Sequence, residues 1–268
     1  MTAFFRTTYF RGYVIGLALL LLVVPGIFAQ SDEESNAPVM ADYDMYHLDG
    51  MGFKAGLGIV NFTDKFKYYT LDTLGDDITA TKLGDYDYES RKTVTFGIFL
   101  TAPIYNNLAI QPEVLYTSRG AKVERNDAYF NGTLEYRLHY LEFPILLRMS
   151  LPTGKDLRPY LLAGPGIAVN IGAKSKIEGH AYNEETEEWE DAGSEEDIDG
   201  LFKGIDWELV VGAGVDYKVG PGKIFIEARY VMGLSVIYSY GVDTLPDGME
   251  APDEHNSAIN ILAGYSFF

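Results

Sequence analysis

Apolar side chains occupy every second position in stretch after stretch of this chain, and this pattern is what most limits how it can fold. In residues 52–62, Phe53, Leu57 and Ile59 alternate with lysine and glycine. A period of two places alternate side chains on opposite faces of a β-strand. The pattern therefore predicts eight strands, each with one apolar face, at 52–62, 93–102, 108–116, 140–149, 158–172, 205–219, 223–234 and 258–268.

The N-terminal region predicts export from the cytoplasm. Arg6 and Arg11 precede an apolar stretch at 13–24, and the small residue Ala29 follows it. This order of regions is that of a secretory signal peptide, and the apolar stretch is short for a membrane anchor. We predict three parts: a signal peptide at 1–29, a flexible acidic leader at 30–49 and one domain at 50–268.

The connections between the predicted strands alternate in length. The longer ones lie at 63–90, 124–132, 174–204 and 239–256, and the short turns at 103–107, 152–156 and 220–222. The three longest hold 23 acidic and 6 basic residues, a balance of −17 within the −18 of the whole chain. The strands and turns are therefore nearly neutral, as expected of a wall embedded in lipid.

These features together predict an all-β fold, an eight-stranded antiparallel up-and-down transmembrane β-barrel. An open sheet in hydrocarbon would leave backbone donors and acceptors unsatisfied, so the sheet must close on itself. Four outer loops and three inner turns place both ends of the barrel on the inner side. Eight strands enclose a lumen that side chains can fill, so a wide aqueous pore is not expected.

Aromatic residues near the predicted strand ends are candidates for the two girdles at the membrane interfaces. An amphipathic ring is best placed at the level of the lipid headgroups. The candidates are Tyr116, Tyr136, Tyr140, Tyr160, Trp207, Tyr217, Tyr230, Tyr238 and Tyr265.

Four segments carry a resemblance to a known family. They are QPEVLYTSRGAK at 111–122, YLEFPILLR at 140–148, RPYLLAGPGIAVNIGAK at 158–174 and GAGVDYKVGPGKIFIEARYVMGL at 212–234. In order and spacing they resemble the PorT-like, or porin-family, outer-membrane β-barrel proteins of Gram-negative, Bacteroidetes-type bacteria, and the resemblance covers residues 50–268. It implies a location in the bacterial outer membrane. Because PorT is associated with protein secretion, it also implies a narrow transport or secretion-accessory role as an alternative function.

Charged residues on the polar strand faces are expected to point into the lumen. In a narrow barrel they must pair or reach water, because an unpaired buried charge is costly. We expect a salt-bridged plug, and the alternative is a gated path or a ligand pocket. The predicted network comprises Glu113, Glu142, Arg148, Glu208, Asp216, Glu227 and Arg229, together with Asp206, Lys218 and Arg119.

The acidic segment 178–199 supplies carboxylates that could bind Ca²⁺ or Mg²⁺, although it lacks the ligand order of an EF-hand. The alternative is a solvated loop. Divalent cations also bridge lipopolysaccharide, so we expect outer-membrane lipid and lipopolysaccharide as partners of the outer loops. So acidic a surface disfavours nucleic acid, and no cofactor is predicted.

Catalysis finds little support in the sequence. Of the four histidines, only His139 is placed where it could approach barrel carboxylates, and nothing marks a nucleophile. We therefore predict a protein that is not an enzyme and has a structural or surface-interaction role. A barrel-embedded enzyme acting on lipid or peptide is the third alternative.

The C-terminal aromatic residues predict a signal for the outer-membrane assembly machinery. The usual signal has an aromatic at the last residue and another two positions before it. Here Tyr265 and Phe267 have that spacing, and Phe268 is one residue more.

Deletion of Phe268 alone should leave assembly intact, measured as the fraction of heat-modifiable barrel in outer membranes. Loss of assembly on this deletion would show that the last residue carries the signal.

Overall fold

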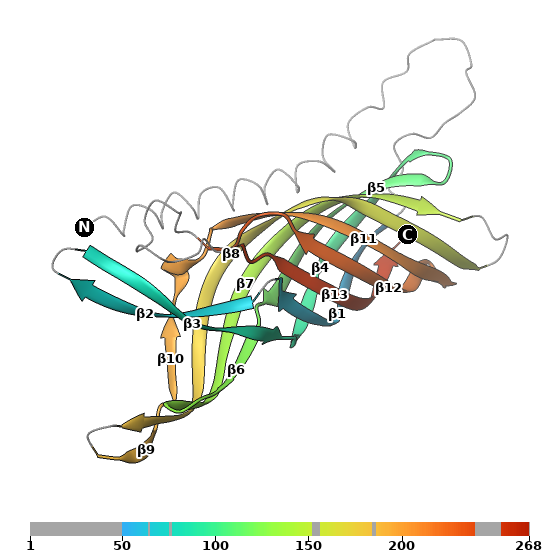
Figure 1. The fold of residues 1–268 in the computed structure, drawn as a ribbon. Coiled ribbons are helices and arrows are strands. Elements are labelled where there is room, and N and C mark those ends of the chain that lie inside the picture. Colours follow the sequence, from blue (N-terminus) through green and yellow to red (C-terminus); the bar gives the residue numbers. More distant parts are fainter. Residues whose placement is uncertain are drawn as a thin grey trace, which may run out of the picture.

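β-Strands form almost the whole of the described chain, as the alternating sequence requires. The computed structural model describes residues 50–63, 65–74, 77–151, 156–183, 186–238 and 253–267 (Figure 1). Among these residues, no helix is both long and apolar enough to cross a membrane. The predicted signal peptide at 1–29, the leader at 30–49 and Phe268 lie outside the described residues.

Eight strands form a closed ring in which each pairs antiparallel with the next along the chain. The last strand pairs with the first, with Ile259 opposite Ile59, so the ring has no open edge. This confirms the prediction of an eight-stranded up-and-down barrel. The ring strands are β1 (Gly50–Phe62), β4 (Arg91–Tyr105), β5 (Leu108–Arg119), β7 (Phe130–Ser150), β8 (Leu157–Asn183), β11 (Ile205–Val219), β12 (Gly222–Gly233) and β13 (Asn256–Phe267).

The outer surface of the barrel is apolar, and its large side chains are exposed. Leu57 on β1 is 69% exposed and Ile259 on β13 is 58% exposed. So much exposed aliphatic surface is suited to lipid rather than to water. The exposed face continues over Ile59, Ile98, Ile145, Ile226 and Ile261.

Two tight turns mark one end of the barrel, which we call the inner end. Asn106 joins β4 to β5 with φ of 45°, and Gly220 joins β11 to β12 with φ of 58°. These are left-handed conformations, which asparagine and glycine adopt more readily than other residues. Met51 lies opposite Phe267 at this end, so both ends of the barrel domain lie on the inner side, as predicted.

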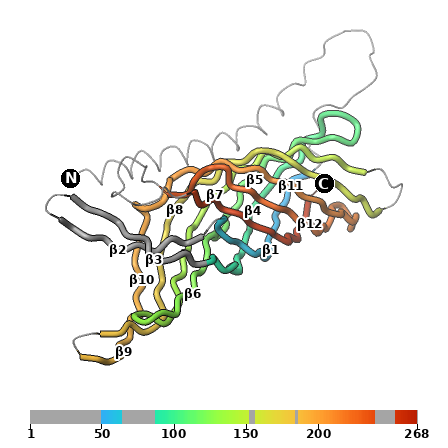
Figure 2. The backbone as a smooth tube through the Cα atoms, in the orientation of Figure 1, coloured from blue at the N-terminus to red at the C-terminus, as the bar shows by residue number. Residues whose placement is uncertain are grey.

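The prediction of irregular loops at 63–90, 124–132 and 174–204 was wrong, because these segments contain strands. β7 and β8 stay paired far beyond the barrel, up to Phe130 opposite Ala181. Further strands extend this pair on both sides and form what we call the outer sheet (Figures 1 and 2). The added elements are β2 (Lys65–Leu74), β3 (Asp77–Glu89), β6 (Lys122–Asn126), β9 (Glu188–Asp191), β10 (Ser194–Asp197) and the 3₁₀ helix η1 (Asp199–Leu201).

Four of the predicted connections are described only in part, since residues 64, 75–76 and 184–185 of the connections at 63–90 and 174–204 lie outside the described residues. Residues 152–155 of the turn between β7 and β8 lie outside the described residues, as do residues 239–252 of the connection between β12 and β13.

Closure of the ring should be sensitive to added bulk at Gly56, where β1 approaches β13. A Cβ at this position would lie 2.0 Å from the Ile261 carbonyl oxygen and 2.7 Å from the Leu262 Cα. Because both are backbone atoms, Gly56→Val should lower the free energy of unfolding by about 1–3 kcal/mol. Urea unfolding of the protein refolded in lipid vesicles measures this.

The matched control is Ala55→Val, which adds a side chain on the exposed face of the same strand. Its unfolding midpoint should stay within error of the parent protein. Equal midpoints for the two variants would contradict the tight approach of β1 and β13.

Candidate functional site

Among the residues that the structure describes, ten buried charged side chains lie in the lumen, four cationic and six acidic. Strand alternation places them there, since the neighbouring residues on each strand face outward. Small residues make room for them: a Cβ at Gly166 would lie 2.6 Å from the Glu208 Oε1 atom. The set comprises Lys54, Glu113, Arg119, Glu142, Arg148, Asp206, Glu208, Asp216, Glu227 and Arg229.

An inner group is centred on Arg148 of β7. Its guanidinium binds the Asp216 carboxylate and donates to the Gln111 Oε1 atom at 3.1 Å. The same guanidinium lies 3.6 Å from the centre of the Tyr160 ring. A cavity of about 10 Å³ adjoins Arg148 and Asp216, which is room for about one water molecule.

A middle group joins two cations to two carboxylates across the barrel. The Lys54 Nζ atom lies 2.9 Å from Glu113 and 3.4 Å from Glu227. The Arg229 guanidinium donates to Glu113 at 2.8 Å and through Nε to Glu227 at 2.8 Å. The Tyr160 hydroxyl donates to Glu227 at 3.0 Å. These contacts connect β1, β5, β8 and β12 through the lumen.

An outer group has one guanidinium and three carboxylates. Arg119 of β5 binds Glu142 of β7 and Glu208 of β11, and Asp206 lies 3.8 Å from its Nη1 atom. The Asn256 amide donates to Asp206 at 3.1 Å. Arg119 is therefore the one cation that neutralises this group among the described residues, which makes the group dependent on it.

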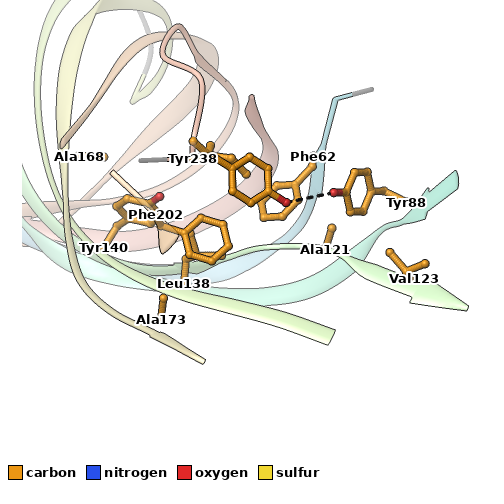
Figure 3. Packing of buried hydrophobic residues seen from close by; sticks show 11 residues of the cluster. Phe62, Tyr88, Ala121, Val123, Leu138, Tyr140, Ala168, Ala173, Phe202 and Tyr238 are labelled. Atoms are coloured by element: carbon orange, nitrogen blue, oxygen red, sulfur yellow. Dashed lines mark hydrogen bonds between the residues drawn. The ribbon is translucent and has the colours of Figure 1, made fainter. Parts of the chain in front are cut away.

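A cluster of aromatic and aliphatic side chains closes the outer mouth of the lumen, and we call it the mouth cluster (Figure 3). The hydroxyl groups of Tyr88 and Tyr238 lie 3.4 Å apart, and the Phe202 ring stacks on Tyr238 at 5.2 Å. Tyr140 connects the cluster to the outer group, because its ring lies 5.3 Å from the Arg119 guanidinium. The members are Phe62, Tyr88, Ala121, Val123, Leu138, Tyr140, Ala168, Ala173, Phe202, Ile237 and Tyr238.

The structure places all seven residues of the predicted network in the lumen, together with Asp206 and Arg119. Lys218 is different: it is exposed at the inner end, opposite Lys223, so its assignment to the network was wrong. Lys54 was missed, although it shares the polar strand face with Gly56 and Gly58. That alternation was a signal that could have identified it.

His139 does not approach the lumen carboxylates, so that expectation was also wrong. Its ring faces outward, where Nδ1 lies 2.7 Å from the Tyr116 hydroxyl. The charged groups that act on it most strongly are the basic side chains of Arg91, Lys174 and Arg137. His139 and Tyr140 are neighbours on β7, so regular alternation points one outward and the other into the lumen. The register shift beside them places the extra residue, Ile171, on β8.

The predicted aromatic girdles are correct only in part. Trp207 and Tyr217 are about half exposed on the lipid-facing surface of β11. Tyr160 is buried in the lumen, and Tyr140 and Tyr238 belong to the mouth cluster. A tyrosine near a strand end faces lipid or lumen according to whether its position along the strand is odd or even. Nearness to the end does not determine this.

Carboxylates of the acidic segment 178–199 are spread along β8, β9 and β10. Within the part of the chain that the structure describes, no group of three or more histidine, aspartate and glutamate side chains converges on a metal-sized site. Binding of divalent cations by this segment stays a prediction.

An ion pair outside the lipid zone connects β4 to the outer part of β7. Glu135 accepts hydrogen bonds from Arg137 at 2.7 Å and from Arg91 at 2.5 Å. These two guanidinium groups, Arg137 more strongly, lower the pKa of Glu135 to about 2. The carboxylate therefore stays charged, and the pair stays formed, throughout the physiological pH range.

Removal of Arg119 should destabilise the barrel strongly. Arg119→Met would leave Glu142 and Glu208 buried without their cation, at a cost of about 3–5 kcal/mol. The triple variant Arg119→Met, Glu142→Gln, Glu208→Gln removes the charges together and should recover at least half of that loss. Urea unfolding in lipid vesicles measures both.

Lys174→Met is the control for this series, because Lys174 pairs with Glu195 on the exposed surface. Its unfolding midpoint should equal that of the parent protein. A triple variant as unstable as Arg119→Met would show that packing around Arg119, and not its charge, stabilises the outer group.

One protein-family model and several solved structures are similar to this chain. The family model described as outer membrane protein beta-barrel domain matches residues 28–239. Outer membrane protein OprG of Pseudomonas aeruginosa is 12% identical, with a TM-score of 0.47 over 81% of this chain and 94% of that one. Neisserial surface protein A is 14% identical, with a TM-score of 0.41 over 83% and 99%. Outer membrane protease OmpT of Escherichia coli is 10% identical, with a TM-score of 0.38 over 84% and 99%.

No curated protein sequence matches the chain. The family model spans well over half of it, from the leader through β12. The closed ring of antiparallel strands is a β-barrel, which is the kind of domain that this model describes. The chain belongs to the outer-membrane β-barrel protein family.

Proposed function

We propose that this outer-membrane protein is a non-conducting barrel that holds its outer sheet at the cell surface for interaction with other molecules. The observation that carries the proposal is the filled lumen. Buried side chains follow one another from the inner group through the middle and outer groups to the mouth cluster. A role in the movement of solutes would require this filling to open.

The energy needed to open the lumen supports the proposal. A path along the barrel axis must separate Lys54 from Glu113 and Arg119 from Glu208, and these side chains are fully buried. Breaking a buried pair costs about 3–5 kcal/mol when the partner stays in place. Two such losses would make an open state a rare event at equilibrium.

The outer sheet supports the surface role. It extends the β7–β8 pair beyond the mouth cluster and carries β2, β3 and β6 on one side and β9 and β10 on the other (Figure 1). A barrel whose role was confined to the membrane would not need this extension. Delivery to the outer membrane would follow cleavage of the signal peptide at 1–29, and lipopolysaccharide would surround the base of the sheet.

Planar-bilayer recording tests the filled lumen. The refolded full-length protein should show no steady single-channel conductance in 1 M KCl. A variant with Lys54, Glu113, Glu227 and Arg229 all replaced by serine should conduct, because the middle group then no longer fills the barrel. Heat-modifiable migration on gels verifies that both proteins are folded.

The matched control replaces Lys174, Lys176, Glu178 and Glu195 by serine, because these four charges lie on the outer sheet. This control should stay silent. Steady conductance of the parent protein would overturn the proposal and favour the alternative of a narrow transport or secretion-accessory component.

A further inference from the structure

Three aromatic side chains form a row across the far end of the outer sheet. Tyr182 of β8 lies opposite Trp189 of β9, and their rings are 5.6 Å apart. On its other side, the Tyr182 amide donates to the Tyr129 carbonyl at 2.8 Å, which places Tyr129 opposite Tyr182. Tyr182 and Trp189 are directly opposite in neighbouring strands and therefore share one face of the sheet, and Tyr129 lies in the turn that precedes β7. We call these three residues the aromatic row.

The aromatic row is too exposed and too distant from the barrel to be a packing feature or a girdle. Tyr129 is 58% exposed and Trp189 is 47% exposed. Along β8, Tyr182 lies nine residues beyond Ala173 of the mouth cluster. At about 3.3 Å per residue this is roughly 30 Å, well outside any headgroup region.

A second row of hydrogen-bonding side chains lies beside the first on the same face. Asn131 of β7, His180 of β8 and Asp191 of β9 are opposite one another in the sheet. Each is two positions from a member of the aromatic row, so it points to the same side. The surface therefore combines flat rings with donors and acceptors, which is the composition of recognition surfaces.

The charge around the aromatic row selects the kind of ligand. Residues 188–197 form the adjoining edge, EWEDAGSEED, with six carboxylates. Lys174 of β8 pairs with two of them, Glu195 and Asp197, and the edge keeps a net negative charge. Polyanions such as phosphorylated or sulfated glycans would be repelled by this field. A cation is attracted, and it also gains from stacking on tryptophan, the most favourable ring for a cation–π contact.

The edge itself favours an extended ligand. Within the described residues, β9 and β10 pair only with β8, so the far side of this edge has no strand beside it. An extended polypeptide can pair with such an edge through its backbone and offer alternate side chains to one face. A second copy of this chain is excluded as the occupant, since like charges would meet directly across the new pair.

We propose that the aromatic row and the adjoining acidic edge form a docking surface for an extended basic polypeptide segment of another protein. An arginine or lysine side chain of the added strand stacks on Trp189, the member of the aromatic row next to the edge, and basic side chains at alternate positions pair with carboxylates such as Asp191. This proposal names a partner class for the proposed surface role and rests on it. The two remain separable, because conductance would overturn the filled lumen without affecting this surface.

Isothermal titration of the full-length protein in lipid nanodiscs tests the docking surface. The probe is a ten-residue peptide of alternating threonine and arginine, and its expected Kd is on the order of 10–100 μM, as for a small exposed site. Trp189→Ala and Asp191→Asn should each raise the Kd at least about five-fold. The same peptide with glutamine in place of arginine should show no binding up to 1 mM.

Tyr217→Ser is the matched control, because Tyr217 is equally exposed but lies on β11 near the inner end. Its Kd should equal that of the parent protein. Tryptophan fluorescence gives a second readout in a Trp207→Phe background, since the chain has two tryptophans and Trp189 is then the one that remains.

Several outcomes would overturn the proposal. An unchanged Kd in Trp189→Ala and Asp191→Asn would show that the peptide binds elsewhere and would reject this surface. Equal Kd values for the glutamine and arginine peptides would show that charge does not contribute to binding. Trp189-dependent binding of maltoheptaose, a neutral oligosaccharide, without binding of the arginine peptide would make this a glycan surface instead. Absence of binding by the arginine peptide would also reject it.

Discussion

Backbone pairing between β13 and β1 is the interaction on which the rest of this structure depends. In hydrocarbon, an unpaired strand edge has no water to satisfy its amide and carbonyl groups, so the barrel exists only as a closed ring. Glycines at the seam, such as Gly56, let the two backbones approach closely. Closure also creates the lumen, and thereby decides which side chains are removed from both water and lipid.

Enclosure by eight strands imposes the second constraint, the pairing of every charge that points inward. The groups around Arg148 and Arg229 match each carboxylate with a cation, and in the outer group Arg119 serves three carboxylates. These contacts cross the barrel rather than follow one strand. Such contacts tie distant strands together, and the mouth cluster shields the outer group from solvent. The same buried ion pairs therefore fill the lumen and stabilise the barrel. Because opening the lumen would break them, they favour a surface role over conduction.

Much of the fold follows from local pattern. All eight ring strands lie where alternation predicts them, and the inward charges from Glu113 to Arg229 follow from the same parity. The outer sheet was not foreseen, because its strands are charged and short and gain their stability by pairing with β7 and β8. Lys218 was misplaced because alternation indicates which face a side chain is on but not how far along the barrel it lies. His139 was misplaced because the predicted strand began at Tyr140 and did not include it, although it shares the outward position of Leu141.

By itself, the sequence determined that this protein is a closed β-barrel with lipid outside and charge inside. Its strands alternate with a period of two and are nearly neutral, so lipid is what covers their apolar faces. Only the tertiary structure decided which charges meet, where the lumen ends and what lies above it. No sequence pattern connects Tyr129, Tyr182 and Trp189. Only the register of β7, β8 and β9 brings these three residues side by side. Register depends on long-range pairing, which no local segment encodes alone.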